Sequence, residues 1–246
     1  MAKCLITNLR HEIKILINYA DYIALANKLS MVCEKDPFTQ ENGDYFIRSL
    51  YLDDIYNSSY NEKISGTDKR HKYRIRIYNY SDSVIKLEKK EKFGSRIKKT
   101  SFPITREMYD DFMADKPETL LSTDEPLAKE VYTMIKSEKL EPSVIVDYDR
   151  EAYVHPLSNT RLTFDKALHS GITDFDIFNK DITTMAVFPE GSVIFEVKYD
   201  DYLPAHLAAI ISTVQGYKIS LSKFCMCRNK LNELNISLLK SNLHTK

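Results

Sequence analysis

Charged side chains recur at every second position in several segments that otherwise resemble β-strands, and most of them are basic. In residues 72–77, Lys72, Arg74 and Arg76 alternate with a tyrosine and two isoleucines. Because strand side chains alternate between the two faces of a sheet, such a segment has one charged face and one apolar face. Residues 10–14, 87–90, 161–165 and 195–198 repeat the pattern. Five such strands predict a shared surface that holds a strongly anionic ligand.

The overall charge of the chain favours a buried position for this surface. The 246 residues include 35 basic and 35 acidic side chains, so the net charge is zero. Bulk electrostatics therefore give no reason to expect non-specific binding to nucleic acid or to an anionic membrane. A cationic site must be local and offset by acidic groups elsewhere.

Length and composition suit one soluble domain over residues 1–246. No apolar stretch approaches the length of a transmembrane helix, and the N-terminus lacks the apolar core of a signal peptide. The four cysteines have neither zinc-binding nor C-x-x-C spacing, which indicates reduced thiols. We therefore expect a cytoplasmic protein without membrane insertion.

The order of elements indicates an α+β protein with antiparallel strand pairs. Alternating patterns predict strands near residues 9–16, 45–52, 70–80, 83–92, 95–104, 142–154, 160–166, 182–188 and 192–199. Helical spacing predicts helices near residues 19–32, 56–64, 105–113, 126–136, 204–214 and 222–239. Breaks at Ser81-Asp82-Ser83 and Phe93-Gly94-Ser95 suit hairpin turns between successive strands.

Two arrangements are compatible with the charged faces. A single strand of this kind is explained most simply by a sheet with one face in water. The set favours a closed barrel with inward charges, whose interior at about eight strands admits side chains or one small ligand. Two cations about 4 Å apart repel there by roughly 4 kcal/mol, so the interior needs a polyanion such as polyphosphate. Glu12, Glu88 and Glu196 offset part of the repulsion, and carboxylates in such a site can also hold Mg²⁺ or Mn²⁺.

Short motifs carry a family resemblance over about residues 8–228. They are Arg10-x-Glu12-x-Lys14, Arg48-Ser49-Leu50-Tyr51-Leu52-Asp53, Lys72-Tyr73-Arg74-Ile75-Arg76-x-Tyr78, Glu88-x-Lys90, Ile97-Lys98-Lys99, Asp147-Tyr148-Asp149-Arg150-Glu151-Ala152-Tyr153, Arg161-Leu162-Thr163-Phe164-Asp165, Glu196-Val197-Lys198-Tyr199, Leu203-Pro204 and Ser222-Lys223-Phe224. In this order they resemble the VTC domain, the catalytic domain of the vacuolar transporter chaperone polyphosphate polymerases. That family belongs to the triphosphate tunnel metalloenzymes.

The resemblance implies a closed antiparallel eight-stranded β-barrel, with helices inserted between the strands and packed outside. Its interior would bind triphosphate and polyphosphate through Lys14, Arg74, Arg76, Lys90, Lys98, Arg161 and Lys223, with Ser222 close by. Arg150 and Lys198 would be further lining residues, and the choice of Lys98 over Lys99 depends on the strand register. Glu196 would bind Mn²⁺ or Mg²⁺, with Glu12 and Glu88 as further carboxylates.

One position departs from the related hydrolases. The CYTH phosphatases and class IV adenylate cyclases begin with Glu-x-Glu-x-Lys, whereas Arg10 stands at the first of those positions here. The missing carboxylate favours the polymerase branch of the superfamily.

The resemblance implies a phosphotransferase that moves the γ-phosphoryl group of ATP onto phosphate, pyrophosphate or polyphosphate. Arg74, Arg76 and Arg161 would cradle the reacting phosphates, and Lys223 with the other lysines would spread positive charge along the chain. No general base is required, because the acceptor phosphate is already ionised. Two alternatives stay open: a tripolyphosphate or nucleoside triphosphate hydrolase of the same fold, and a polyphosphate-binding module without catalysis.

Overall fold

The computed structural model describes residues 5–6, 10–40, 43–94, 96–220 and 222–243, and their side chains between residues 10 and 235. The strands are β1 (Leu5–Ile6), β2 (His11–Asn18), β3 (Glu34–Lys35), β4 (Tyr45–Asp53), β5 (Lys69–Tyr78), β6 (Ser81–Phe93), β7 (Arg96–Ile104), β8 (Glu141–His155), β9 (Thr160–Gly171), β10 (Thr184–Ala186), β11 (Ser192–Tyr199) and β12 (Tyr217–Lys218). The α-helices are α1 (Tyr19–Ser30), α2 (Ser58–Ile64), α3 (Arg106–Met113), α4 (Pro126–Glu138), α5 (Ala205–Ile211) and α6 (Lys223–Leu243). Short 3₁₀ helices span Pro117–Ser122 and Leu157–Asn159.

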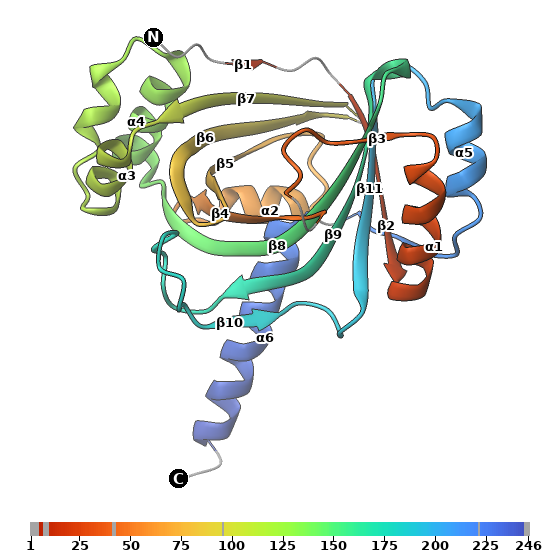
Figure 1. Cartoon of the computed structure of the whole chain (residues 1–246). Coiled ribbons are helices and arrows are strands. Elements are labelled where there is room, and N and C mark those ends of the chain that lie inside the picture. The colour runs from red at the N-terminus through yellow and green to blue at the C-terminus, as the bar shows by residue number, and fades with distance from the viewer. Residues whose placement is uncertain (1–4, 7–9, 41–42, 95, 221, 244–246) are drawn as a thin grey trace.

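All the strands belong to one antiparallel sheet that forms the body of the molecule (Figure 1). Its order is β1-β7-β6-β5-β4-β8-β9-β11-β2-β12, with β10 paired to β9 and β3 paired to β8. The sheet curves so strongly that its two ends approach each other. Arg10, just before β2, forms an isolated bridge with Ile97 of β7, with 3.3 Å from the Arg10 nitrogen to the Ile97 oxygen.

The predicted α+β class and the antiparallel sheet are therefore confirmed, but the closed eight-stranded barrel is not. Between β2 and β7 the described residues form that one bridge and no continuous ladder. The two N-terminal strands lie on opposite sides of this gap. β1 pairs with β7, and β2 pairs with β11.

Apolar side chains on the outer face of the sheet explain where the helices pack. On one side, Leu50, Ile75 and Leu87 share a buried cluster with Val131 of α4 and Phe112 of α3. On the other side, α1 and α5 cover the outer faces of β2, β9 and β11 in a second buried cluster. Figure 1 shows these two helical layers on opposite flanks of the curved sheet. Because one face of each strand is occupied in this way, the charged face turns inward.

The first turns of α6 pack against the inner face. Phe224 and Cys225 are fully buried in a cluster with Tyr51, Val144 and Ile194, whose side chains lie on the concave side of the sheet. In Figure 1 the helix starts beside α2 and runs outward from the sheet toward the C-terminus. The start of α6 therefore contributes side chains to the interior of the protein.

Side-chain caps mark the starts of two helices, α1 and α3. The Asn18 side chain accepts a hydrogen bond from the Asp21 nitrogen at 2.8 Å, and Thr105 caps α3 in the same way at 3.1 Å. The predicted turn at Ser81-Asp82-Ser83 is wrong by two residues. β5 ends at Tyr78 and β6 starts at Ser81, so the turn residues are Asn79 and Tyr80, both with positive φ (52° and 56°) as in a type I′ hairpin.

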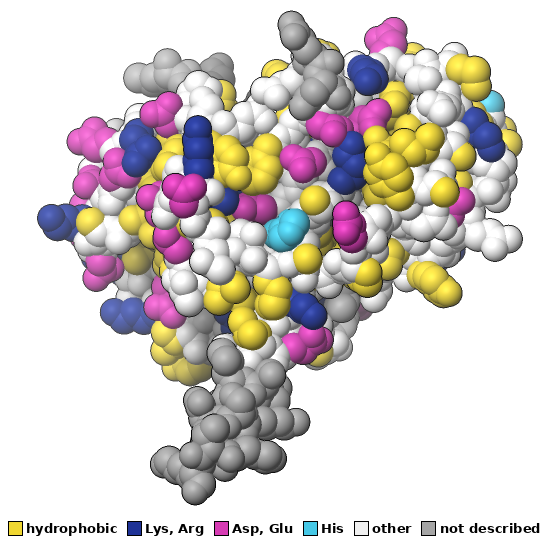
Figure 2. All heavy atoms as spheres, turned by 60° about the horizontal axis from the view of Figure 1, so that its bottom comes forward, with side chains coloured by type: hydrophobic (Ala, Val, Ile, Leu, Met, Phe, Trp, Pro, Cys, Tyr) yellow, Lys and Arg dark blue, Asp and Glu magenta, His cyan; other side chains and the backbone are white. Residues whose placement is uncertain are grey.

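The predicted strand at residues 182–188 is reduced to the three residues of β10, while the other predicted strands and all the predicted helices are present. No helix within the described ranges combines the length and the apolarity needed to cross a membrane. On the face shown in Figure 2, basic and acidic side chains are interspersed. That mixture agrees with a net charge of zero.

Candidate functional site

The strand register brings the predicted charged residues onto the inner face. Across β5 and β6, Arg74 lies opposite Glu88, and across β11 and β2, Glu196 lies opposite Lys14 and Lys198 opposite Glu12. Residues directly opposite in an antiparallel pair point to the same face of the sheet. We call the following set the central network: Glu12, Lys14, Arg74, Arg76, Glu88, Lys90, Lys99, Arg150, Asp165, Glu196, Lys198 and Lys223.

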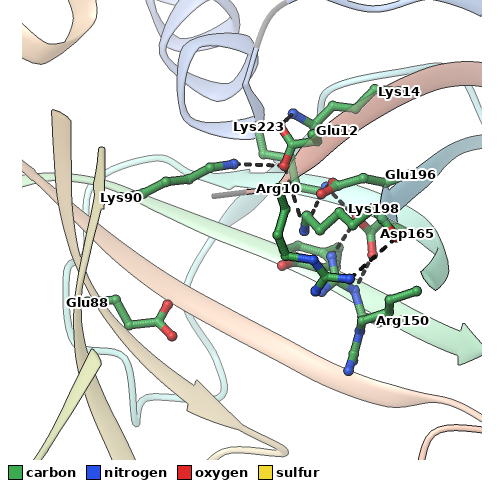
Figure 3. A network of polar contacts seen from close by, with 12 residues as sticks. Arg10, Glu12, Lys14, Glu88, Lys90, Arg150, Asp165, Glu196, Lys198 and Lys223 are labelled. Atoms are coloured by element: carbon green, nitrogen blue, oxygen red, sulfur yellow. Dashed lines mark hydrogen bonds and ion pairs between the residues drawn. The ribbon is translucent and has the colours of Figure 1, made fainter. Parts of the chain in front are cut away.

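Glu12 joins three strands within this network (Figure 3). Its carboxylate accepts a hydrogen bond from Lys90 Nζ at 2.9 Å, pairs with Lys14 on the same strand and lies 3.7 Å from Lys198 Nζ. Burial alone would raise the pKa of Glu12, but Lys90, Lys14 and Lys198 together lower that pKa to about 2. Glu12 is therefore ionised at any physiological pH.

A second group surrounds Asp165 of β9. Arg150 donates two hydrogen bonds to its carboxylate, at 2.6 and 2.8 Å, and Lys223 of α6 also pairs with it. Lys223 Nζ lies 3.6 Å from Glu196, which also pairs with Lys198. Burial would raise the pKa of Glu196, yet the nearby ammonium groups, led by Lys198, hold that pKa well below its usual range.

A third group surrounds Glu88, which Figure 3 shows apart from the other acids. Arg74 donates from Nε to Glu88 at 2.7 Å, Lys99 Nζ lies 3.0 Å away, and Arg76 approaches to 3.9 Å. Glu88 is only 1% exposed. Its pKa stays well below the usual range, because Arg74, Arg76 and Lys99 outweigh the effect of burial.

The register also decides between two neighbouring lysines. Lys99 lies opposite Lys90 and shares the inner face, whereas Lys98 lies opposite Glu91 on the outer face. Lys98 Nζ is 4.0 Å from the Glu91 carboxylate. The structure therefore places Lys99 in the network in place of the predicted Lys98, because a shift of one residue reverses the face.

Two predicted residues lie at the edge of the network. Arg161 of β9 pairs with the buried carboxylate of Asp36 and donates a hydrogen bond to the Tyr45 hydroxyl at 2.9 Å. Ser222, which precedes α6, accepts a hydrogen bond from Lys72 Nζ at 2.7 Å. Both face the interior but have their own partners.

The central network carries an excess of positive charge. It contains eight basic side chains and four carboxylates, which leaves four positive charges uncompensated. Burial lowers the pKa of Lys198 to about 8, although Glu196 and Glu12 partly oppose that effect. A polyanion in this region would exchange carboxylate contacts for phosphate contacts and neutralise the excess.

Several residues of the site were not selected from the sequence. Tyrosine hydroxyls orient the arginines: Tyr51 accepts from Arg74 at 2.8 Å and Tyr148 accepts from Arg76 at 3.1 Å. The sequence signal for Tyr51 was its position two residues after Ser49 in the same strand, which puts both on one polar face. Tyrosines at such positions are, however, commonly packing residues. Asp165 was visible in the 161–165 pattern, yet its pairing with Lys223 depends on long-range packing.

The predicted metal ligands fit a divalent ion only in part. Glu12 and Glu196 lie close enough to influence each other's ionisation, and carboxylate oxygens suit Mg²⁺ or Mn²⁺. Glu88 belongs to the separate group around Arg74. Within the described part of the chain, no cluster of three or more His, Cys, Asp or Glu residues is arranged to hold a metal ion. Glu12 and Glu196 would thus be two ligands, with the others supplied by phosphate and water.

Comparisons with known proteins identify the family and the fold. The model of the VTC domain family matches residues 9–232. No curated protein matches the sequence. Among solved structures, a candidate adenylyl cyclase, HpAC1 from Hippeastrum, described as having a dominant triphosphatase activity, is 12% identical with a TM-score of 0.52, covering 91% of this chain and 96% of that chain.

Two further solved structures are similar at lower TM-scores. The PH1819 protein from Pyrococcus horikoshii OT3 is 13% identical, with a TM-score of 0.46 and coverage of 90% of this chain and 99% of that chain. A candidate adenylate cyclase from Bacillus halodurans is 12% identical, with a TM-score of 0.47 and coverage of 84% and 87%. At such identities the likeness to the Hippeastrum protein concerns the fold alone.

Proposed function

The chain belongs to the VTC domain family, and from this membership we propose that it transfers the γ-phosphoryl group of ATP to phosphate, pyrophosphate or a growing polyphosphate. The observation that carries the proposal is the charge excess of the central network. Eight buried or half-buried cations converge there around four carboxylates, in a chain with no net charge. A linked row of phosphates is the ligand that such an elongated group of Arg and Lys fits best.

Phosphoryl transfer needs an acceptor in line and a neutralised transferring group more than it needs an acid or a base. Arg74 and Arg76 have guanidinium groups oriented by tyrosine hydroxyls, so they are positioned to bind phosphate oxygens when their contacts with Glu88 are exchanged for phosphate. Arg161 and Lys223 would complete the binding of the reacting phosphates. Lys14, Lys90, Lys99, Arg150 and Lys198 would stabilise charge along the rest of the chain.

A divalent metal, Mn²⁺ or Mg²⁺, is part of the proposal. Glu196 and Glu12 would hold it, and it would supply charge neutralisation at the phosphate oxygens of the nucleotide. Lys198 and Lys223 pair with Glu196, so an ion held by that carboxylate would leave Lys198 freer to contact the phosphates, while Lys223 would keep its ion pair with Asp165. A cytoplasmic location remains an expectation from the sequence.

The test is a direct assay of the purified chain with ATP and Mn²⁺. We expect acid-insoluble polyphosphate to accumulate, and Arg74→Ala and Lys223→Ala to abolish it. Lys129→Ala is the control, because Lys129 pairs with the exposed Asp124 on the surface. Thermal unfolding must show that each variant is folded. Absence of polymer with folded wild-type protein, over a range of acceptors, would refute the proposal.

A second candidate is hydrolysis of tripolyphosphate or a nucleoside triphosphate. The dominant triphosphatase activity ascribed to the Hippeastrum protein of the same fold favours it. Water would then replace phosphate as the acceptor, and Glu12 or Glu88 would have to leave its ammonium or guanidinium partners to orient that water. Release of orthophosphate without chain elongation identifies this activity. Tight binding of polyphosphate with ATP unchanged would identify a binding module.

A further inference from the structure

Beyond the central network, β5 and β6 continue with pairs of like charge. Lys72 lies opposite Lys90, and Arg70 lies opposite Lys92, at the start of β5 and the end of β6. Opposite side chains in an antiparallel pair have Cβ atoms about 4.5–5.5 Å apart, and like charges there destabilise the sheet. The sheet alone does not favour two such pairs on one face, so an interaction with another group must offset their repulsion.

Two of these cations are buried without an acidic partner. Arg70 and Lys72 are each 9% exposed. Lys72 Nζ donates to Ser222 Oγ at 2.7 Å and contacts Cys225 Sγ at 3.2 Å, and Arg70 donates to the Thr67 carbonyl. Neither forms an ion pair with a carboxylate among the residues that the structure describes. A buried charge left in this way is destabilising unless a ligand neutralises it.

Helix α2 brings another cation to the same place. Within the described ranges neither Lys63, in its last turn, nor Lys92 forms an ion pair with a carboxylate, although Glu12 acts on Lys92 from beyond ion-pair distance. Burial, and then the positive charges of Arg70, Lys92 and Lys72, lower the pKa of Lys63 to about 8. Lys63, Arg70, Lys72 and Lys92 thus act on one another, and we call them the distal cation group.

The distal cation group differs from the central network in its charge balance. Every basic side chain of the central network pairs with Glu12, Glu88, Asp165 or Glu196. The distal group has four cations, and none of them pairs with a carboxylate in the part of the chain that the structure describes. Arg70 is four residues from Arg74 along β5, which corresponds to roughly 13 Å of strand. One small phosphate beside Arg74 therefore cannot also reach Arg70, whereas Lys72, opposite Lys90, adjoins the central network.

We propose that the distal cation group binds the continuation of a phosphate chain whose reacting end lies in the central network, so that long polyphosphates are preferred to short ones. This inference rests on the proposed function, since it assigns the rest of the same ligand. Lys72 connects the two regions, because it contacts Ser222, the neighbour of Lys223. The ligand is an extended, unbranched polyanion with charge at every linked unit.

The experiment measures the binding of pyrophosphate, tripolyphosphate and long-chain polyphosphate to the full chain in metal-free buffer. The variants are Lys63→Gln, Arg70→Gln and Lys92→Gln. The matched control is Lys69→Gln, because Lys69 adjoins Arg70 on β5 but is exposed on the opposite face. We expect each variant to lose about tenfold in affinity for the long chain, as for one charge-assisted contact, and less than about twofold for pyrophosphate.

The control should bind all three ligands like the wild-type chain. Thermal unfolding separates binding from folding, because removal of an uncompensated cation should leave the melting temperature unchanged or raise it. Equal losses for pyrophosphate and for the long chain, or no loss for either, would overturn the inference. A loss of the same size for a single-stranded oligonucleotide would also overturn it, because the group would then bind any polyanion.

The outcome is distinguishable from that of the polymerase assay. If no polymer forms from ATP but the variants lose affinity only for the long chain, the proposed function fails and the distal site stands. If polymer forms and the variants bind long chains as tightly as the wild type does, the distal site fails and the proposed function stands.

Discussion

Asp165 neutralises two buried cations. Replacing its carboxylate should show whether tripolyphosphate can bind those cations in its place. Arg150 and Lys223 both pair with its carboxylate, which is completely shielded from solvent. Breaking a buried ion pair by removing one partner costs about 3–5 kcal/mol. We expect Asp165→Asn to lower the free energy of unfolding by that amount. Tripolyphosphate should then stabilise the variant more than the wild type, because the anion replaces the lost carboxylate.

Asp147→Asn is the control for this prediction. Asp147 forms a buried ion pair with Arg48 at 2.7 Å on the outer side of the sheet. Its removal should destabilise the protein comparably, with no extra rescue by tripolyphosphate. Denaturant unfolding with and without the ligand measures both effects. Equal rescue of the two variants would show that the anion does not bind beside Arg150 and Lys223.

Lys198 should make anion binding sensitive to pH. Burial lowers its pKa to about 8, against about 10.4 in an unfolded chain. Between these values the unfolded state binds more protons, so this group makes the folded state more stable as pH rises. Anion binding should change in the opposite direction, because Lys198 loses its charge above about pH 8. The affinity for tripolyphosphate in EDTA should therefore fall through that range.

Lys198→Arg is the matched variant, because arginine keeps its charge at these pH values. Titration of the ligand itself affects both proteins equally, so the comparison isolates Lys198. Isothermal titration calorimetry at pH 7, 8 and 9 gives the two profiles. Parallel profiles would exclude a contribution from Lys198.

At the scale of the strand, the register of β7 makes a prediction about two adjacent lysines. Lys99 contacts Glu88 on the inner face, and Lys98 faces Glu91 on the outer face. We expect Lys99→Ala to weaken tripolyphosphate binding about tenfold or more, as for the loss of a charge-assisted contact. Lys98→Ala should change it less than about twofold. The opposite ranking would mean that β7 is shifted by one residue.

This pair also shows where the sequence stops being informative about the site. Alternation alone correctly placed Arg74, Glu88 and Lys14 on one face, because each lies in a strand with a regular period of two. In residues 96–100, Lys98 and Lys99 are adjacent, so one of them must face inward and the other outward. Alternation alone does not say which. The register that selects Lys99 comes from pairing with β6, a long-range contact.

The same limit applies to whole elements. The helices and most strands followed from capping residues and apolar spacing, which are local. The turn at Asn79 and Tyr80 was missed because a tyrosine with positive φ is uncommon, and only the pairing of Tyr78 with Ser81 requires it. The position of the start of α6 inside the sheet also depends on tertiary packing, so Lys223 could be assigned only through the family resemblance.

The start of α6 should be essential for both stability and binding. Phe224 is fully buried, stacks on Tyr51 with 5.1 Å between ring centroids and lies 4.5 Å below Lys72 Nζ. Phe224→Ala should cost about 3–5 kcal/mol, as in other cores. Because Phe224 follows Lys223 directly, we also expect weaker binding of tripolyphosphate, measured by calorimetry at a temperature where the variant is folded.

Leu25→Ala provides the comparison. Leu25 of α1 is equally buried, but in the cluster that covers the outer face of the sheet. It should lose about 2–5 kcal/mol of stability and keep its affinity. If both variants bind equally well, the packing of α6 does not position Lys223.

At the scale of the molecule, charge is separated between an interior with excess cations and a surface that balances it. The chain has no net charge, although the central network and the distal cation group together carry eight uncompensated positive charges. Such an interior destabilises the ligand-free protein, and water screens it less than it screens the surface. Repulsion between these cations therefore lowers the stability of the ligand-free protein, and a bound polyanion removes that repulsion.

This separation predicts a graded stabilisation of the whole protein by ligand charge. A ligand that binds only the folded state adds RT ln(1 + [L]/Kd), or about 2.7 kcal/mol at a concentration of 100 Kd. At equal concentration, phosphate, pyrophosphate and tripolyphosphate should raise the melting temperature in that order, as each added phosphate reaches further cations. An oligonucleotide of the same total charge should raise it far less, because the surface carries the compensating negative charge and offers no binding site for a nucleic acid. Scanning fluorimetry compares the four ligands directly, and an oligonucleotide as effective as tripolyphosphate would place the binding cations on the outside of the protein.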